Sequence, residues 1–336
     1  MAAIPALSPR QDNTTSSGDD AWAGFELWHY TPSIAAAVIF IILFMGLTGY
    51  HTFLIVRRRT WFCIPFVVGG LFEIVGYIGR ALSHSDTENT QYYIIQSLGL
   101  LLAPILFAAS IYMILGRIIR VLQAEEHSII RVNWLTKIFV GGDIFCFMIQ
   151  GAGGGLLSKA TTSSQIDTYN NIILGGVILQ ILVFVLFLTT ALIFQSRLHR
   201  QPTAASLDGP LGEHNGLTGG RLGKLTWKKI MLGLYASSML ILVRNLYRTI
   251  EYGMGWNSYL LATEWPLYVF DALLMVLVLT ICIMWYDPEI SKGNKKSAAT
   301  ARSYEAHNLE NGDGMVQGQR EVHTVKNESN RLRPWS

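Results

Sequence analysis

Seven ionisable side chains lie inside stretches of this sequence that are otherwise apolar. They are Glu73, Arg80, Asp143, Arg244, Arg248, Glu251 and Asp271. A charge at the centre of a bilayer costs about 2.5–3.5 kcal/mol on insertion scales, so such residues usually face the interior of a helix bundle. Their types allow two kinds of chemistry there. Guanidinium groups hold anionic groups, and carboxylates hold ammonium groups or carry protons, for which Glu73 and Asp143 are the candidates.

The spacing of these residues predicts which of them share a helix face. Glu73 and Arg80 are seven residues apart, which puts them on one face but about 10.5 Å apart along the axis. That separation is too long for an ordinary ion pair, so each is expected to find its partner on another helix. Arg244, Arg248 and Glu251 follow at steps of four and three and form a single stripe.

The depth of each charge predicts its partners. Glu73 falls near the midplane and Arg244 slightly further out, so these two are expected to meet. We predict a polar cavity between spans two, four, six and seven that opens toward the outside, to which Gln96 and Gln150 add polar groups. A closed ion-pair network that only fixes helix register remains an open alternative, since four carboxylates nearly balance three guanidinium groups under either interpretation.

Long apolar segments must position these charges, and they indicate a membrane protein. The chain is 51% hydrophobic and only 15% charged, and a helix needs roughly 20 apolar residues to cross the bilayer. Seven segments qualify: 33–56, 61–82, 92–115, 134–157, 172–194, 229–252 and 264–286. The sequence therefore predicts an all-α, polytopic membrane protein with seven transmembrane helices. The membrane domain is predicted to span 33–286, between a disordered extracellular N-terminus at 1–32 and a disordered cytosolic tail at 287–336.

The basic residues predict the orientation. They gather in alternate loops and after the last span, whereas the opposite segments hold only Arg10 and Lys159. The positive-inside rule therefore predicts an N-terminus outside and a C-terminus in the cytosol. On this topology Asn13, in the sequon Asn13-Thr14-Thr15, is the expected glycosylation site.

Several function classes are disfavoured by what the spans contain. All three cysteines fall within the apolar segments, so no extracellular disulfide framework is expected. His51 is the one histidine near a span, so we expect no metal site, no cofactor and no enzymatic activity. The stretch "GGRLGKLT" lacks the Gly and Ser/Thr positions of a nucleotide-binding loop, which argues against an ATP-driven pump.

Five ordered motifs resemble a known family. They are "FEIVGYIGR", "QSLGLLLAPILFAASIY", "GGDIFCFMIQGAGGG", "RNLYRTIEYG" and "EWPLYVFDALLM". They resemble motifs of the fungal RTA1-like proteins, also called the lipid-translocating exporter family. The motif positions carried over on this resemblance are Glu73, Tyr77, Arg80, Gln96, Pro104, Asp143, Gln150, Arg244, Arg248, Glu251, Glu264 and Asp271.

The resemblance implies a membrane transporter that exports lipids or toxic amphiphiles, such as sphingoid long-chain bases or drugs, and that confers stress resistance. The partners it implies are membrane lipids or amphipathic small molecules, with no nucleic acid, and the expected location is the plasma membrane. The alternative is a seven-helix lipid or stress sensor that acts on resistance indirectly. A G-protein-coupled receptor is disfavoured, since span three ends in "LGRIIR" and span seven in "IMWYDPEI". The oligomeric state is left open.

Overall fold

The computed structural model of the chain describes residues 33–85, 90–157, 163–203, 206–207, 226–254 and 263–286. Within these residues the chain is helical and contains no strand. Seven helices are long and apolar enough to cross a membrane, which confirms the predicted all-α fold with seven spans. The predicted terminal segments 1–32, with Asn13, and 287–336 lie outside the described residues, and the orientation in the membrane stays a prediction.

The first six spans are single long helices, and the seventh is composite. The six are α1 (Ile34–Arg58), α2 (Ile64–Ser83, after the short turn η2, Trp61–Cys63), α3 (Thr90–Val121), α4 (Val132–Leu157), α5 (Ser163–Arg200) and α8 (Trp227–Gly253). The seventh joins α10 (Trp265–Leu267), η4 (Tyr268–Leu273), α11 (Leu274–Cys282) and η5 (Ile283–Trp285). A short turn, η3 (Glu125–His127), links α3 to α4. Helices α3 and α5 extend well beyond their predicted spans.

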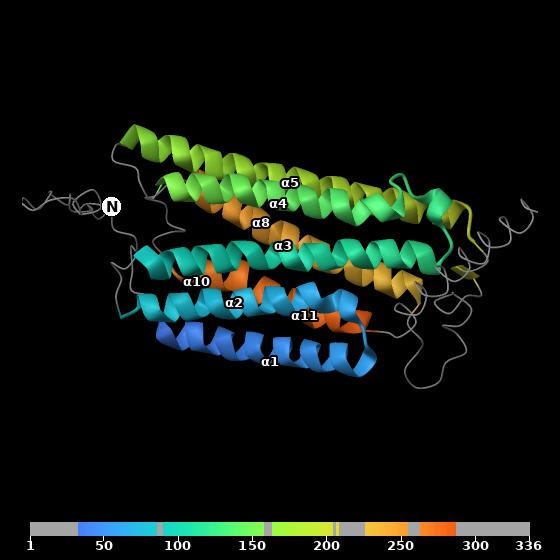
Figure 1. Cartoon of the computed structure of the whole chain (residues 1–336), viewed down its shortest axis with the longest axis horizontal. Coiled ribbons are helices and arrows are strands. Elements are labelled where there is room, and N and C mark those ends of the chain that lie inside the picture. The colour runs from blue at the N-terminus through green and yellow to red at the C-terminus, as the bar shows by residue number, and fades with distance from the viewer. Residues whose placement is uncertain are drawn as a thin grey trace, which may run out of the picture.

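Figure 1 shows the helices side by side along one common direction. Helix α3 packs against α2 on one side and α4 on the other, while α5 covers α4 and α1 covers α2. The most apolar stretch of α3 is 72% buried, against 28% for α1 and for α4. Helix α3 is therefore the central helix, and it continues through Pro104 without interruption.

The packing is that expected of a bundle in lipid. Large apolar side chains such as Ile42, Leu186 and Leu232 point outward and are more than 60% exposed, whereas all seven of the predicted intramembrane charges are buried inside. Helices α2 and α3 approach closely where Gly99 faces Gly76. A Cβ atom on Gly99 would lie 3.0 Å from the Gly76 Cα, so glycine permits this contact.

Candidate functional site

A wide turn in the seventh span positions the acidic side chains of the site. Residues Tyr268–Leu273 form a π-helical turn, which widens the helix locally and is often found at functional sites. The turn carries Tyr268 and Asp271, and Glu264 lies just before α10. Their spacing of four and three puts all three side chains on the side that faces α2 and α8.

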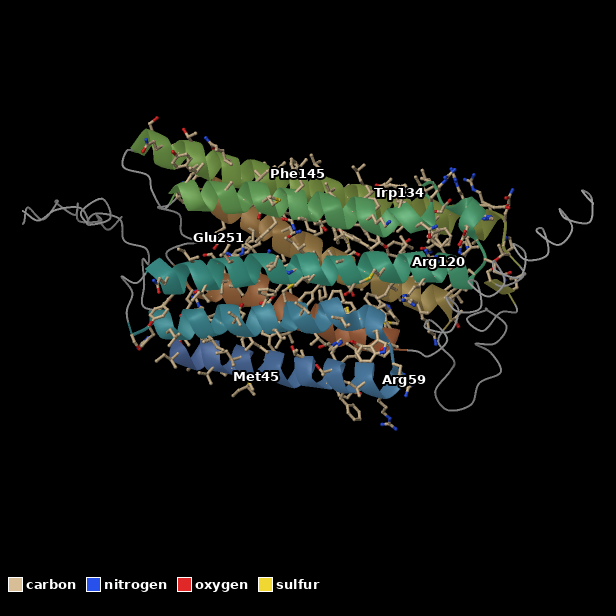
Figure 2. The ribbon with its side chains drawn as sticks, in the orientation of Figure 1. Met45, Arg59, Arg120, Trp134, Phe145 and Glu251 are labelled. Carbon is tan, nitrogen blue, oxygen red and sulfur yellow. The ribbon has the colours of Figure 1, made fainter. Side chains whose placement is uncertain are left out.

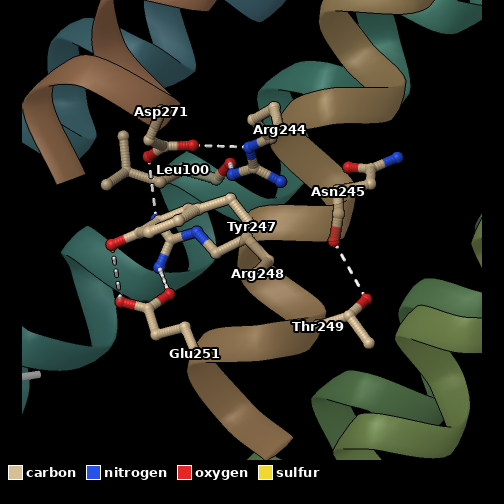
Figure 3. Close-up of polar contacts among 8 residues, drawn as sticks. All are labelled: Leu100, Arg244, Asn245, Tyr247, Arg248, Thr249, Glu251 and Asp271. Atoms are coloured by element: carbon tan, nitrogen blue, oxygen red, sulfur yellow. Dashed lines mark hydrogen bonds and ion pairs between the residues drawn. The ribbon is translucent and has the colours of Figure 1, made fainter. Parts of the chain in front are cut away.

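Four residues form what we call the Asp271 network: Arg244, Arg248, Glu251 and Asp271 (Figure 3). The Asp271 carboxylate accepts from Arg244 Nε at 2.5 Å and from Arg248 Nη2 at 2.8 Å. Arg248 also pairs with Glu251 through Nη1 at 2.8 Å. The predicted stripe on α8 is thus confirmed, and both of its arginines are held by one carboxylate of the seventh span.

The network is also tied to the central helix through a backbone group. Arg244 Nη2 donates to the carbonyl oxygen of Leu100 at 2.5 Å, as Figure 3 shows. Because a guanidinium presents several donors in a fixed fork, it can bind a carboxylate and a carbonyl together. The Asp271 network therefore joins α3, α8 and the seventh span.

Arg80 pairs with a second acidic residue, Glu264. Arg80 is fully buried, and its Nη2 lies 2.9 Å from Glu264 Oε1, while its Nε donates to the Tyr268 hydroxyl at 3.0 Å. The same Glu264 oxygen accepts from the backbone N–H of Ser33 at 2.8 Å. The expectation that Arg80 finds its partner on another helix is confirmed. This pair fastens α2 and the start of α1 to the seventh span.

The predicted pairing of Glu73 with Arg244 is wrong. Arg244 is occupied by Asp271 and by the Leu100 carbonyl. Glu73 is 1% exposed, and among the described residues neither of its carboxylate oxygens has a hydrogen-bond partner. It still lies close enough to Asp271, Arg244 and Arg248 to interact with them electrostatically. Glu73 is thus a buried carboxylate beside the network and outside its hydrogen bonds.

An aromatic wall lies next to Glu73, formed by Phe40, Phe44, Tyr77 and Tyr268. Tyr77 follows Glu73 by one turn of α2 and is fully buried. Its ring stacks on Phe44 and Phe40 at centroid distances of 5.7 and 5.8 Å and on Tyr268 at 6.2 Å. Its hydroxyl has no hydrogen-bond partner in the described part of the chain. A carboxylate and aromatic faces are together suited to binding an organic cation.

The prediction that span four shares a cavity with spans two, six and seven is also wrong. Asp143 and Gln150 belong to two other hydrogen-bonded pairs, Tyr112–Asp143 and Gln150–Gln180, which we together call the Asp143 cluster. Tyr112 donates to Asp143 Oδ2 at 2.8 Å, and Gln150 Nε2 donates to Gln180 Oε1 at 2.9 Å. These residues come from α3, α4 and α5. Helix α4 packs mainly against α3 and α5, and within the described part of the chain its contacts with α2, α8 and the seventh span are few or none, so this cluster is separate from the Asp271 network.

Gln96 is the remaining predicted site residue. It is 6% exposed on α3, where α3 packs against Gly79 of α2, and its Oε1 has no partner among the described residues. Gln96 therefore lies on the side of the central helix that faces α2, the helix that carries Glu73 and Tyr77.

Reasoning from the sequence missed five contributors: Phe40, Phe44, Tyr112, Tyr268 and the Leu100 carbonyl. The two tyrosines lie within the recognised motifs, and Tyr268 follows Glu264 by one helical turn, which is a usable signal. A backbone carbonyl acceptor has no signature in the sequence. Among the described residues no group of three or more His, Cys, Asp or Glu side chains is placed to hold a metal ion.

Comparisons with known proteins identify the family. The chain matches the family model described as "RTA1 like protein" over residues 66–294. It is 35% identical over 292 residues to protoporphyrin uptake protein 1 of Saccharomyces cerevisiae, covering 76% of this chain and 90% of that protein. It is 33% identical over 287 residues to protein RTA1 of the same yeast, covering 78% and 84%.

A third relative is more distant. The chain is 26% identical over 286 residues to the sphingoid long-chain base transporter RSB1 of Saccharomyces cerevisiae, covering 79% of this chain and 74% of that protein. No solved structure matches the chain. The seven apolar helices and the family match together establish that this chain is a multi-pass membrane protein and belongs to the RTA1-like family.

Proposed function

We propose that this protein translocates lipids or toxic amphiphiles across the membrane, with Glu73 and the aromatic wall as the binding point for a cationic headgroup. Two similar proteins support a transport role, because one is named a sphingoid long-chain base transporter and the other a protoporphyrin uptake protein. The proposed substrate class is an amphiphile with an ammonium group, such as a sphingoid long-chain base.

The observation that carries the proposal is that Glu73 is buried and has no hydrogen-bond partner among the described residues. The other charges near Glu73 are neutralised in pairs. Arg244 and Arg248 pair with Asp271, Arg248 also pairs with Glu251, and Arg80 pairs with Glu264. Glu73 is as buried as Asp271, at 1% exposure, but accepts no hydrogen bond from any described residue. A buried carboxylate without a partner is costly, and in a membrane protein such a residue is by default a functional candidate.

The chemistry follows from the charge of the ligand. An ammonium group at Glu73 forms a charge-assisted pair and lies against the Tyr77 and Phe44 rings. Pairing cancels both charges, which lowers the cost of carrying the headgroup through the apolar interior. The alkyl chain of the ligand remains in the surrounding lipid. No covalent step is required, so the protein acts as a carrier rather than an enzyme, driven by a proton gradient or by downhill flow.

The cellular setting is part of the same proposal. We place the N-terminus outside and the C-terminus in the cytosol, because the basic residues gather at one end of the bundle. Asn13 is then the glycosylation site, and the plasma membrane is the location from which export of toxic amphiphiles would confer stress resistance.

The proposal is tested in liposomes that contain only the purified protein and a fluorescent long-chain base. Wild-type protein is expected to move the base across the bilayer, and Glu73→Gln is expected to reduce the rate at least about tenfold, the loss expected when a charge-assisted contact is removed. Glu125→Gln, which changes an exposed carboxylate of the η3 turn, is the matched control and should leave the rate unchanged.

The opposite outcome favours the alternative function. Liposomes with folded wild-type protein that move no base, alongside a cellular response that remains dependent on the ligand, would identify a sensor and overturn the transport proposal.

A further inference from the structure

The basic end of the bundle contains a second candidate site, far from Glu73. A recess of about 370 Å³, which we call the Arg197 recess, is lined by Glu126, His127, Arg197, Arg200 and Gln201. Its walls are the η3 turn and the last turn of α5. The positive-inside rule assigns this end to the cytosolic side, where the membrane surface carries anionic lipids.

The end of α5 brings three of the lining residues together. Arg200, the last residue of α5, and Gln201, directly after it, follow Arg197 by three and four residues and therefore lie on the same side as Arg197. Arg197 Nη1 donates to the His127 carbonyl at 3.5 Å, and Thr203 Oγ1 donates to the Leu122 carbonyl at 2.7 Å. These bonds hold the end of α5 against the segment that follows α3, so the recess is bounded by ordered backbone.

The two arginines of the recess are exposed and have N–H donors available for a ligand, whereas both ring nitrogens of His127 are enclosed. Arg200 is exposed and forms no ion pair within the described part of the chain. By contrast, Arg120 nearby donates to Asn133 at 2.6 Å. Two guanidinium groups at one recess present several donors, which match the several acceptor oxygens of a phosphate group.

The depth of the recess favours a phosphate carried by a lipid. Leu186 and Leu192 of α5 are 61% and 55% exposed, as expected of side chains that face hydrocarbon. Arg197 follows Leu192 by five residues, which is about 7.5 Å along the helix axis. The arginines therefore lie just beyond the apolar surface of α5, at the level where lipid headgroups begin.

We propose that the Arg197 recess binds the phosphomonoester headgroup of an anionic membrane lipid, such as a phosphoinositide. One carboxylate, Glu126, lines the recess and opposes an anion there, which makes its removal an informative variant. The site is independent of the transport proposal, because none of its residues takes part in the Asp271 network or the aromatic wall.

The test measures binding of a fluorescent phosphatidylinositol phosphate to the full chain in phosphatidylcholine nanodiscs. The double variant Arg197→Gln with Arg200→Gln is expected to bind at least about tenfold more weakly than wild type. The matched control is Arg57→Gln with Arg59→Gln, which removes two charges from the same end of the bundle but from the last turn and C-cap of α1 (Figure 2 labels Arg59). The control should stay within about twofold of wild type.

A variant that is expected to strengthen binding and a soluble competitor make the test more specific. Glu126→Gln is expected to tighten binding, which a merely structural role would not produce. Equal loss in the control double variant, or wild-type binding no tighter than that of the Arg197/Arg200 variant, would overturn the proposal. Soluble inositol phosphate is expected to displace the fluorescent lipid only weakly. If it displaced that lipid as well as the same lipid without the fluorescent label does, the assignment to a lipid would be overturned.

Discussion

The Asp271 network, on α8 and the seventh span, and the Asp143 cluster, on α3, α4 and α5, stabilise their buried carboxylates in different ways. Asp271 is held by two guanidinium groups, those of Arg244 and Arg248. Asp143 accepts a hydrogen bond from the neutral hydroxyl of Tyr112 and has no cationic partner among the described residues. Both aspartates are 1% exposed, so the difference lies in their partners and not in their burial.

Glu73 differs from both of these buried aspartates. Glu73 is buried to the same extent as the two aspartates, yet among the described residues it has neither the ion pairs of one nor the hydrogen bond of the other. The Asp271 network accounts for its own charges and therefore has a structural explanation. Glu73 has none, which is why the transport proposal rests on it.

The largest effect on stability is expected from Asp271→Asn. The change leaves Arg244 and Arg248 buried without a charged partner, and breaking a buried pair in this way costs about 3–5 kcal/mol. Denaturant unfolding in detergent micelles measures the loss. Asp167→Asn, an exposed position on α5, is the control and should change stability by less than about 0.5 kcal/mol. Similar values for both variants would show that the network contributes little.

A smaller loss is expected in the Asp143 cluster from Tyr112→Phe. The variant keeps the ring, whose centroid lies 4.4 Å from that of Phe187, but removes the donor to Asp143 and should cost about 1–3 kcal/mol. Tyr235→Phe is the matched control, because the Tyr235 hydroxyl has no partner among the described residues. A loss for Tyr112→Phe as large as that for Asp271→Asn would remove the distinction between the two regions.

The smallest effect on stability is expected from Glu73→Gln. Since this carboxylate accepts no hydrogen bond from the described residues, making it neutral removes a desolvation cost and should change the free energy of unfolding by no more than about 1 kcal/mol, in either direction. The same unfolding experiment in micelles measures it. A loss comparable to that of Asp271→Asn would mean that Glu73 has a structural partner after all.

The regular helices explain what could be predicted from the sequence. The seven spans and the stripe of Arg244, Arg248 and Glu251 follow from apolar length and from the 3.6-residue period. The partner of Arg244 did not follow, because counting depth assumes uniform helices, whereas the seventh span contains a π-helical turn at Asp271. A carbonyl acceptor such as that of Leu100 is equally invisible in a sequence.

The position of Asp143 shows a second limit. Its depth in span four was compatible with a shared cavity, but which helices are neighbours depends on tertiary packing. Because α4 packs against α3 and α5 rather than α8, Asp143 meets Tyr112 instead of the arginines of α8. A pattern of charges on one helix fixes the face that they share and leaves open the helix that they meet.

Direct binding of a long-chain base to the purified protein in nanodiscs tests the central claim, that Glu73 and not Asp143 receives the cationic headgroup. Glu73→Gln is expected to weaken binding at least about tenfold, while Asp143→Asn, which keeps an acceptor for Tyr112, should stay within about twofold of wild type. Unchanged affinity in Glu73→Gln, or an equal loss in Asp143→Asn, would contradict the account.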